Sequence, residues 1–288
     1  MRNLTATLCL TIILLLGSVG ASWSADWNKG LTAFKSGDYA TALREWTPLA
    51  EKGNARAQNA MGNIYKHGLG VPKDDNTALK WYRLSAENGE KRGQFSLGLM
   101  YASGKGVPLD YKTALKWWTL AAKQGHARAQ WNLGVMYEHG DVGPKDYKTA
   151  VKWYTLAAVQ GNARAQTALG FMYEIGKGVP KDAKTAVKWY SLAAKQGNAR
   201  AQTNLGFMYE NGKGVPKDHK TAVKWYRLAA EQGHASAQYN LGVMYNAGKG
   251  VPQDDRTAEK WWRLAAEQGY ARAQYHLENL LKPWWKFW

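Results

Sequence analysis

A unit of 36 residues recurs along the chain, and this repetition constrains the fold more than any other feature of the sequence. Its clearest marker is a segment rich in glycine, which reads GLGVPKD at 68–74, GKGVPLD at 104–110, GDVGPKD at 140–146, GKGVPKD at 176–182 and 212–218, and GKGVPQD at 248–254. Glycine, tyrosine and tryptophan positions elsewhere keep the same step. Such a period predicts an array of stacked, similar units rather than one globular core.

The Gly-Lys-Gly of this segment has only a superficial likeness to a phosphate-binding loop. The distance from Gly170 to Lys177 is one residue too long, and Gly178 stands where a Ser or Thr would hold magnesium. A nucleotide site is needed once, whereas the segment occurs six times. It is therefore interpreted as a turn, in which the glycines permit positive φ, Pro180 ends one helix and Asp182 caps the next.

Each unit contains two stretches with a helical period. In residues 162–197 the repeated apolar positions are Ala165, Leu169, Met172 and Tyr173 in the first stretch, and Ala186, Trp189, Tyr190, Ala193 and Ala194 in the second. These spacings are typical of helices with one apolar face. A single helix pair cannot bury such a face, but stacked pairs can. The sequence therefore predicts an all-α solenoid, with Trp189 in the stripe that neighbouring helices share.

The units resemble a known family. Read from Ala165 to Gly197, the pattern A-x-x-x-LG-x-x-Y-x-x-G-x-GV-x-x-D-x-x-x-A-x-x-W-Y-x-x-A-A-x-x-G looks like the Sel1-like repeat, a relative of the tetratricopeptide repeat. The resemblance implies a right-handed superhelix of helix pairs that serves as an interaction scaffold. One copy departs from the pattern, because GDVGPKD exchanges Val and Gly at 142–143.

The repeats suggest a division of the chain into four parts. Residues 54–269 hold six units of 36 residues, and residues 26–53 resemble a tetratricopeptide hairpin with a short turn at Gly37. Residues 270–288 are interpreted as a C-terminal cap helix followed by the aromatic tail KPWWKFW. The tail is expected to fold over the end of the solenoid, and contact with a membrane interface is the alternative.

Residues 1–25 have the layout of a secretory signal peptide. Arg2 is followed by an uncharged stretch from Leu4 to Ala21 and then by small residues. Cleavage would leave a periplasmic or secreted protein, and retention as an uncleaved membrane anchor is the alternative. Cys9, the single cysteine of the chain, lies in this segment, so the mature protein would contain no disulfide.

A search for chemistry finds no catalytic motif, and the sequence predicts neither an enzyme nor a cofactor or metal site. The histidines at 126 and 234 occupy a position where other units have Asn, and they are interpreted as variants of a helix start. The alternative function is an envelope enzyme or a penicillin-binding protein of the β-lactamase-like subgroup that the family includes. That subgroup has recurrent disulfide-bonded cysteines, which this chain lacks.

The resemblance to tetratricopeptide repeats implies that the first helix of each unit lines a concave groove. The positions implied in one unit are Arg164, Thr167, Phe171, Glu174 and Ile175. The candidate partner-binding residues on this stripe are Arg92, Arg128, Arg164, Arg200, Phe95, Trp131, Phe171, Phe207 and Tyr239. The alternatives are that the arginines form salt bridges with a neighbouring helix and that the apolar row is core between units. A row of glutamates at 138, 174 and 210 is expected to face solvent.

The formal net charge is +17, which favours anionic partners. Much of it comes from a row on the second helices, Lys80, Lys116, Lys152, Lys188, Lys224 and Lys260, which is expected on the outer face. The predicted function is an exported monomeric scaffold that binds another protein or peptide in its groove. A weak contact with an anionic envelope surface is compatible with the charge, whereas nucleic acid is not expected because no nucleic-acid-binding motif is present.

Overall fold

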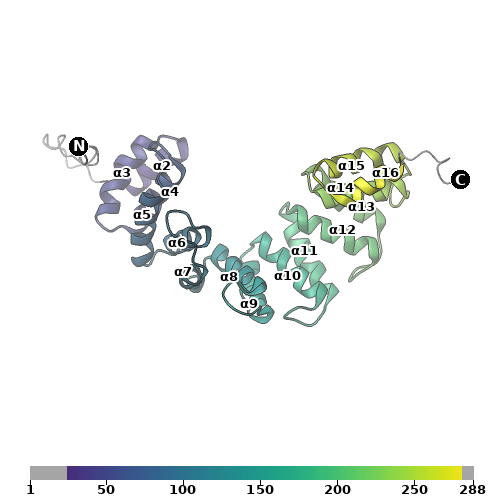
Figure 1. The fold of residues 1–288 in the computed structure, drawn as a ribbon, viewed down its shortest axis with the longest axis horizontal. Helices are drawn as coiled ribbons and strands as arrows, with labels where there is room; N and C mark the ends of the chain where they lie inside the picture. Colours follow the sequence, from purple (N-terminus) through teal and green to yellow (C-terminus); the bar gives the residue numbers. More distant parts are fainter. Residues whose placement is uncertain (1–24, 281–288) are drawn as a thin grey trace.

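The computed structural model describes residues 25–280, which contain 15 α-helices and no strand. In chain order they are α2 Trp27–Ser36, α3 Tyr39–Glu51, α4 Ala55–His67, α5 Asp75–Glu87, α6 Lys91–Ser103, α7 Tyr111–Lys123, α8 Ala127–His139, α9 Tyr147–Val159, α10 Ala163–Ile175, α11 Ala183–Lys195, α12 Ala199–Asn211, α13 His219–Glu231, α14 Ala235–Asn246, α15 Asp255–Glu267 and α16 Ala271–Leu280. Each helix packs on the next in the sequence, and together they follow an arc (Figure 1). The predicted all-α solenoid is confirmed.

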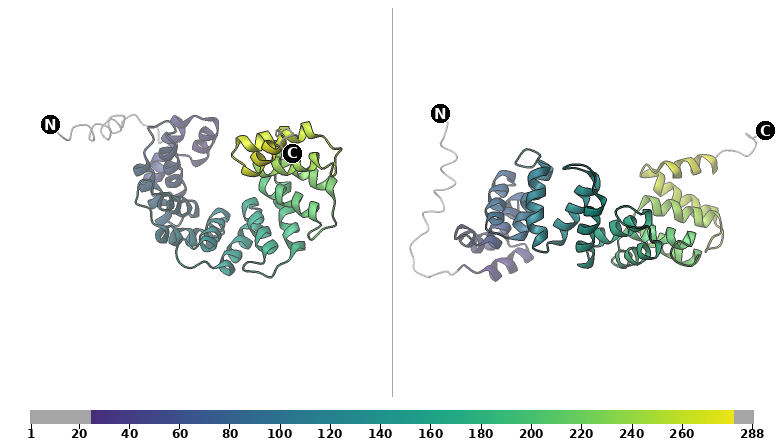
Figure 2. Two further views of the ribbon diagram at one scale, coloured as in Figure 1. Left: turned by 45° about the vertical axis from the view of Figure 1, so that its right-hand side comes forward. Right: turned by 90° about the horizontal axis from the view of Figure 1, so that it is seen from below.

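The arc is open on one side, as the two further views also show (Figure 2). The helices from α4 to α15 alternate between a first and a second helix of each unit. The predicted signal peptide at 1–25, except for Ala25, and the predicted aromatic tail at 282–288 lie outside the described part of the chain. Within residues 25–280 no helix combines the length and the apolar character needed to cross a membrane.

The two helices of a unit approach closely because a glycine faces an aromatic ring. A Cβ atom at Gly170 would lie 2.7 Å from Cδ1 of Tyr190, a distance that real side chains do not reach. The same contact joins Gly134 to Tyr154. Tyr190 is fully buried, whereas Trp189 is only partly buried and packs against the core formed by α9 and α10. The predicted place of Trp189 in the stripe shared by neighbouring helices agrees with this contact, but the fully buried ring is that of Tyr190, which lies beside the glycine.

Neighbouring units are held together by a core that crosses their boundary. Buried residues of a second helix, such as Val151 and Tyr154 in α9, cluster with Leu169 and Met172 of the following first helix. The same arrangement recurs between α11 and α12 and between α13 and α14. Each unit therefore needs its neighbour to bury its apolar face, as expected for a solenoid.

A chain of glutamine side chains also links the units, and the sequence reasoning did not identify it. Buried Gln166 donates from Nε2 to the carbonyl oxygen of Ala158 at 3.0 Å, in the preceding unit, and its Oε1 accepts from Gln196 Nε2 at 2.8 Å. The next unit repeats both bonds at Gln202 and Gln232. The step of 36 residues between these glutamines was the available signal. Each glutamine thus joins a carbonyl at the C-terminal end of the preceding second helix, which also accepts from a backbone N–H, to a glutamine of its own unit.

The predicted turn segments start and end helices as expected. Gly176 adopts φ 73° after α10, and Asp182 accepts a hydrogen bond from the backbone N of Thr185 at 3.1 Å at the start of α11. The Thr185 hydroxyl donates to the same carboxylate at 2.6 Å. This hydroxyl contact, followed by the backbone contact, lowers the pKa of Asp182. Aspartates cap the other second helices of the repeats in the same way.

Candidate protein-binding groove

The first helices of the units form one face of the solenoid, called here the first-helix face and made by α4, α6, α8, α10, α12 and α14. Their starts are fixed by capping side chains: Asn162 accepts a hydrogen bond from the backbone N of Ala165 at 3.0 Å, and His126 Nδ1 accepts from Ala129 N at 3.2 Å. The interpretation of His126 as a helix-start variant is thus consistent with its cap bond. His234 occupies the corresponding position without such a bond and contacts the Thr203 hydroxyl at 3.0 Å instead.

Because every first helix starts at the same point of its unit, an arginine recurs in the first turn of five of them. Arg56, Arg92, Arg128, Arg164 and Arg200 are all exposed. A cation in the first turn opposes the helix dipole by about 0.3–1 kcal/mol, so the helix itself gains nothing from it. The role of these arginines therefore has to come from contacts other than those with their own helix.

The centre of the first-helix face contains a hollow of about 540 Å³, called here the central hollow. Three consecutive first helices line it: α8 contributes Trp131, α10 contributes Arg164 and Phe171, and α12 contributes Arg200. Four of the candidate residues, drawn from three units, thus meet at one site. The guanidinium of Arg164 lies 5.4 Å from the centre of the Trp131 ring, a contact that holds the cation over the aromatic wall.

A second hollow of about 500 Å³, called here the flanking hollow, lies two units closer to the N-terminus, between α4, α6 and the start of α8. It is lined by three more candidate residues, Arg92, Phe95 and Arg128. His126 also belongs to it and stacks on Phe95 with the ring centres 4.5 Å apart. Burial, followed by the charge of Lys91 and nearby arginines, lowers the pKa of His126 to about 4. The imidazole is therefore neutral at pH 7.

The two remaining candidates do not line either hollow. Phe207 is exposed, and the Lys213 ammonium lies 4.6 Å from its ring centre. Tyr239 is partly buried in an aromatic group near the C-terminus, where its hydroxyl lies 3.1 Å from His276 Nε2 and its ring centre 5.3 Å from that of Tyr270. The structure therefore separates these two side chains from the seven that line the hollows.

Within residues 25–280 the arginines of this face make one ion pair, between Arg56 and Glu90 at 3.9 Å. The interpretation of the arginine row as salt bridges to a neighbouring helix holds for Arg56 alone. Arg92, Arg128 and Arg200 have no ion pair with any residue in the described part of the chain. In residues 25–280 these three arginines thus have no carboxylate within ion-pair distance, although Glu138 lines the central hollow together with Arg164 and Arg200.

The glutamate row does not simply face solvent, so that part of the sequence interpretation was wrong. Glu138, Glu174 and Glu210 are partly buried, and each accepts a hydrogen bond from a buried tyrosine of the following second helix. The distance from the tyrosine hydroxyl to Oε2 is 2.7 Å for Glu174. Burial, followed by the neighbouring carboxylate, raises the pKa of Tyr190. These glutamates serve the contact between the two helices of a unit.

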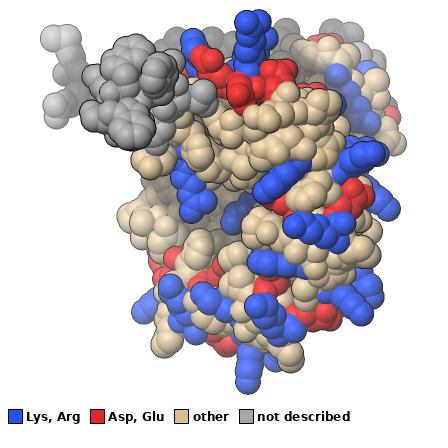
Figure 3. Space-filling model, turned by 90° about the vertical axis from the view of Figure 1, so that its right-hand side faces the viewer, with Lys and Arg blue, Asp and Glu red and all other residues tan. Residues whose placement is uncertain are grey.

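The second helices carry the predicted lysine row. Lys80, Lys116, Lys152, Lys188, Lys224 and Lys260 are all exposed on second helices. Figure 3 looks at the C-terminal side of the molecule, where Lys and Arg side chains are distributed over the surface with fewer Asp and Glu side chains between them. In the structured part of the chain no three His, Cys, Asp or Glu side chains are arranged to hold a metal ion.

Comparison with known proteins identifies the repeat. The family model described as Sel1 repeat matches six consecutive stretches, 55–90, 91–126, 127–162, 163–198, 199–234 and 235–270. Each stretch begins one residue after the unit frame expected from the sequence. No curated protein matches the chain.

Two solved structures are similar over most of the chain. A protective antigen present in uropathogenic Escherichia coli strains, which displays an SLR fold, is 36% identical with a TM-score of 0.77 over 83% of this chain. This chain spans 51% of the length of that antigen. A Sel1 repeat protein from Oxalobacter formigenes is 34% identical with a TM-score of 0.75, over 82% of this chain and 94% of the other.

Proposed function

The chain belongs to the Sel1 repeat family, whose solenoids are generally scaffolds for protein–protein interaction, and from this premise we propose that its first-helix face binds an extended acidic segment of another protein. The arginines of the face grip carboxylates or backbone carbonyls of that segment. The apolar side chains between them receive its other residues.

The central hollow is the observation that carries this proposal. It combines two exposed arginines, Arg164 and Arg200, with the aromatic side chains Trp131 and Phe171. Guanidinium groups bind carboxylates through paired hydrogen bonds, and they do so more strongly where an apolar wall excludes water. A segment with acidic and apolar side chains matches both parts of the site.

The flanking hollow supports an elongated rather than a compact ligand. It presents Arg92, Phe95 and Arg128, so the combination of cation and aromatic ring recurs along the solenoid axis. A ligand that uses both hollows has to run across several first helices. Extended segments cover such distances with few residues, since a strand rises about 3.3 Å per residue.

The proposed setting is the periplasm or the outside of the cell, with the protein acting as a monomeric adaptor without catalytic activity. Export rests on the sequence of residues 1–25 alone. The lysine row of the second helices is proposed to add a weak, salt-sensitive attraction to an anionic envelope surface.

The test begins with proximity labelling of proteins around the exported chain, followed by measurement of the affinity of one purified partner. Replacing Arg164 and Arg200 by Ala should weaken binding at least tenfold, because each lost charged hydrogen bond is worth about 1.5–3 kcal/mol. The melting temperature should stay nearly unchanged, since neither side chain is buried.

The matched control replaces Lys152 and Lys188, two exposed cations of the second helices, by Ala. This variant removes the same charge and should mainly reduce the salt dependence of the affinity. If the arginine variant has a lower melting temperature but an unchanged affinity for the partner, the arginines are structural links between units. The partner site must then be sought away from the first-helix face.

A further inference from the structure

The N-terminal end of the first-helix face contains a smaller and more apolar hollow of about 180 Å³, called here the N-terminal hollow. Its apolar walls are Trp27, Leu31 and Phe34 of α2 and Trp46 of α3, helices that precede the six repeats. None of these residues lies in a stretch that the family model matches. The hollow is thus a feature added to the repeats by the N-terminal hairpin.

The aromatic side chains that line the hollow pack against one another, but several of them remain partly exposed to solvent. The Trp27 and Trp46 rings stack with their centres 5.1 Å apart, and the Phe34 ring lies 5.5 Å from that of Trp46. Trp46 is 2% exposed and donates from Nε1 to the carbonyl oxygen of Trp27 at 3.2 Å. Trp27, Leu31 and Phe34 remain partly exposed. The hollow therefore offers apolar surface to a side chain that can fill it.

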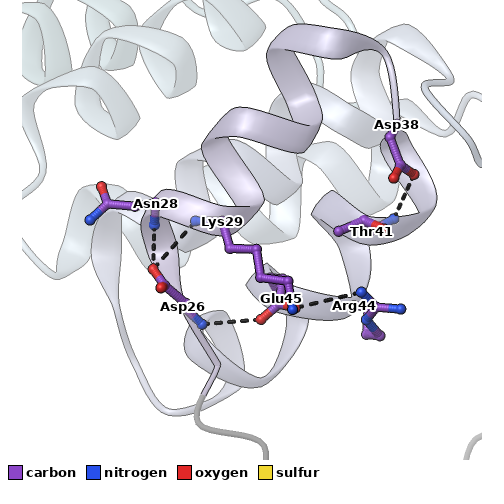
Figure 4. A network of polar contacts seen from close by, with 7 residues as sticks. All are labelled: Asp26, Asn28, Lys29, Asp38, Thr41, Arg44 and Glu45. Atoms are coloured by element: carbon purple, nitrogen blue, oxygen red, sulfur yellow. Dashed lines mark hydrogen bonds and ion pairs between the residues drawn. The ribbon is translucent and has the colours of Figure 1, made fainter.

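A buried carboxylate fixes the helix that carries three of these walls (Figure 4). Glu45 of α3 is 3% exposed, accepts from the backbone N of Asp26 at 3.2 Å, and pairs with the Lys29 ammonium at 3.0 Å. Asp26 in turn caps α2 by accepting from the backbone N of Asn28 at 2.7 Å. The contact with Lys29, followed by that with Asp26, lowers the pKa of Glu45. The hollow is therefore preformed, and a ligand loses little free energy in ordering it.

The N-terminal hollow opens into the arginine row. Arg56 and Arg92 stand at its edge, and it shares Arg92 together with Asn59 and Asn63 with the flanking hollow. Glu90, also at the edge, is paired with Arg56 at 3.9 Å. A segment that leaves the N-terminal hollow along the first helices thus meets Arg92 and then Arg128, both without an ion pair among residues 25–280.

We propose that the N-terminal hollow receives a bulky apolar side chain, aromatic or leucine-like, at one end of the acidic segment that the arginines bind. The occupant follows from the apolar walls of the hollow and from the positive charge of the path that leads out of it. An anchor of this kind sets the register of the segment, because a row of similar arginines alone permits it to slide by one unit. The inference rests on the proposed function of the first-helix face.

The test uses synthetic peptides labelled with fluorescein and the full chain in low salt. One peptide carries Phe-Leu at one end of a stretch of alternating Asp and Glu, a second carries it at the other end, and a third has Ser-Ser in place of Phe-Leu. One of the two Phe-Leu peptides should bind about tenfold more tightly than the Ser-Ser peptide, as expected when one large apolar side chain is buried. Which one does so gives the direction of the bound segment.

The gain should disappear in Leu31→Ser and persist in Leu192→Ser, a matched control at an exposed leucine of α11. Nuclear Overhauser contacts between the peptide phenylalanine and the Leu31 methyl groups of the unmodified chain provide a second readout, which does not depend on the stability of a variant. Equal affinity for all three peptides, or the absence of these contacts, overturns the anchor and leaves the arginine groove intact. If no peptide binds, the proposed function of the face fails together with the anchor.

Discussion

The third unit (127–162) and the fourth unit (163–198) share one frame and differ where their loops meet the preceding unit. In the fourth unit Gly178 rests on the start of α9, and a Cβ atom there would lie 2.3 Å from the carbonyl oxygen of Tyr147. In the third unit the order of Val and Gly is reversed, and a Cβ atom at Gly143 would meet nothing within 4 Å. Gly178 is thus restricted both by its φ of 74° and by close backbone contact, whereas Gly143 is restricted by its φ of 158° alone.

The same two units differ in the opposite sense on the first-helix face. The third unit places large Trp131 and smaller Val135 at positions where the fourth places buried Thr167 and larger Phe171. All four side chains line the central hollow. The exchange of large and small side chains between neighbouring helices leaves space between two aromatic walls. Trp131, Val135 and Phe171 also pack against the cores between units, so the same side chains stabilise the stack and shape the binding surface.

The largest effect is expected from removing the buried ring that both units need. Tyr190→Ala in the fourth unit and Tyr154→Ala in the third should each cost about 3–5 kcal/mol, because each ring is at most 1% exposed and fills the space beside a glycine. Trp189→Ala should cost clearly less, since Trp189 is only partly buried. Urea denaturation followed by circular dichroism measures all three. Equal denaturation midpoints for Tyr190→Ala and Trp189→Ala would show that the ring beside the glycine contributes no more to stability than its neighbour.

An intermediate effect is expected at the two loops, and it tests the comparison directly. Gly178→Ala forces a side chain into a φ of 74° and against the backbone of the preceding unit, so it should cost about 2–4 kcal/mol. Gly143→Ala meets only the unfavourable φ of 158° and should cost about 1–2 kcal/mol. Thermal unfolding of the two variants gives the difference. If Gly143→Ala lost more stability than Gly178→Ala, Gly143 would have to make a contact that the structure of its loop does not show.

The smallest effect on stability is expected at the start of α8, and this effect depends on pH. His126, whose pKa is lowered to about 4, caps α8 where the fourth unit has Asn162. A histidine with a lowered pKa contributes stability that is complete above its unfolded pKa of about 6.5 and is lost as the pH falls towards 4. The unmodified chain should therefore lose about 1 kcal/mol of stability between pH 6.5 and pH 4, a value suited to a half-buried ring. The His126→Asn variant should not show this loss.

Melting temperatures between pH 4 and pH 7.5 test this expectation. At pH 7 the His126→Asn variant should be slightly less stable than the unmodified chain, because it lacks the stacking of His126 on Phe95. The reciprocal variant Asn162→His should gain a dependence on pH in the same window. Parallel pH profiles for all three proteins would contradict the role given to His126.

Much of the scaffold was predictable from the residues because the same residue types recur at corresponding positions of each unit. The recurring Gly, Pro and Asp of the loops gave the helix ends, and the apolar spacing gave the helices. What could not be predicted was which of two adjacent aromatic residues is buried. Trp189 and Tyr190 are neighbours on α11, and Gly170 on the preceding helix α10 leaves space for the ring of Tyr190.

The candidate site was predictable in part, and for a related reason. The repeat period placed the arginines on one face, and the structure brings Arg164 and Arg200 together with Trp131 and Phe171 at one hollow. The same period also grouped Phe207 and Tyr239 with them, although neither lines that hollow. The repeat period did not indicate that Glu174 accepts a hydrogen bond from the Tyr190 hydroxyl, because that bond joins positions 16 residues apart on two helices.

The sequence by itself determined the architecture, since a pattern repeated six times can be satisfied only by units that bury one another's apolar faces. Only the tertiary structure decided the shape of the binding face. The hollows lie between first helices that are 36 residues apart in the chain, and their size depends on how the side chains of neighbouring units fit together. Local periodicity specifies where a side chain stands on its own helix, whereas the packing of the units specifies what stands beside it.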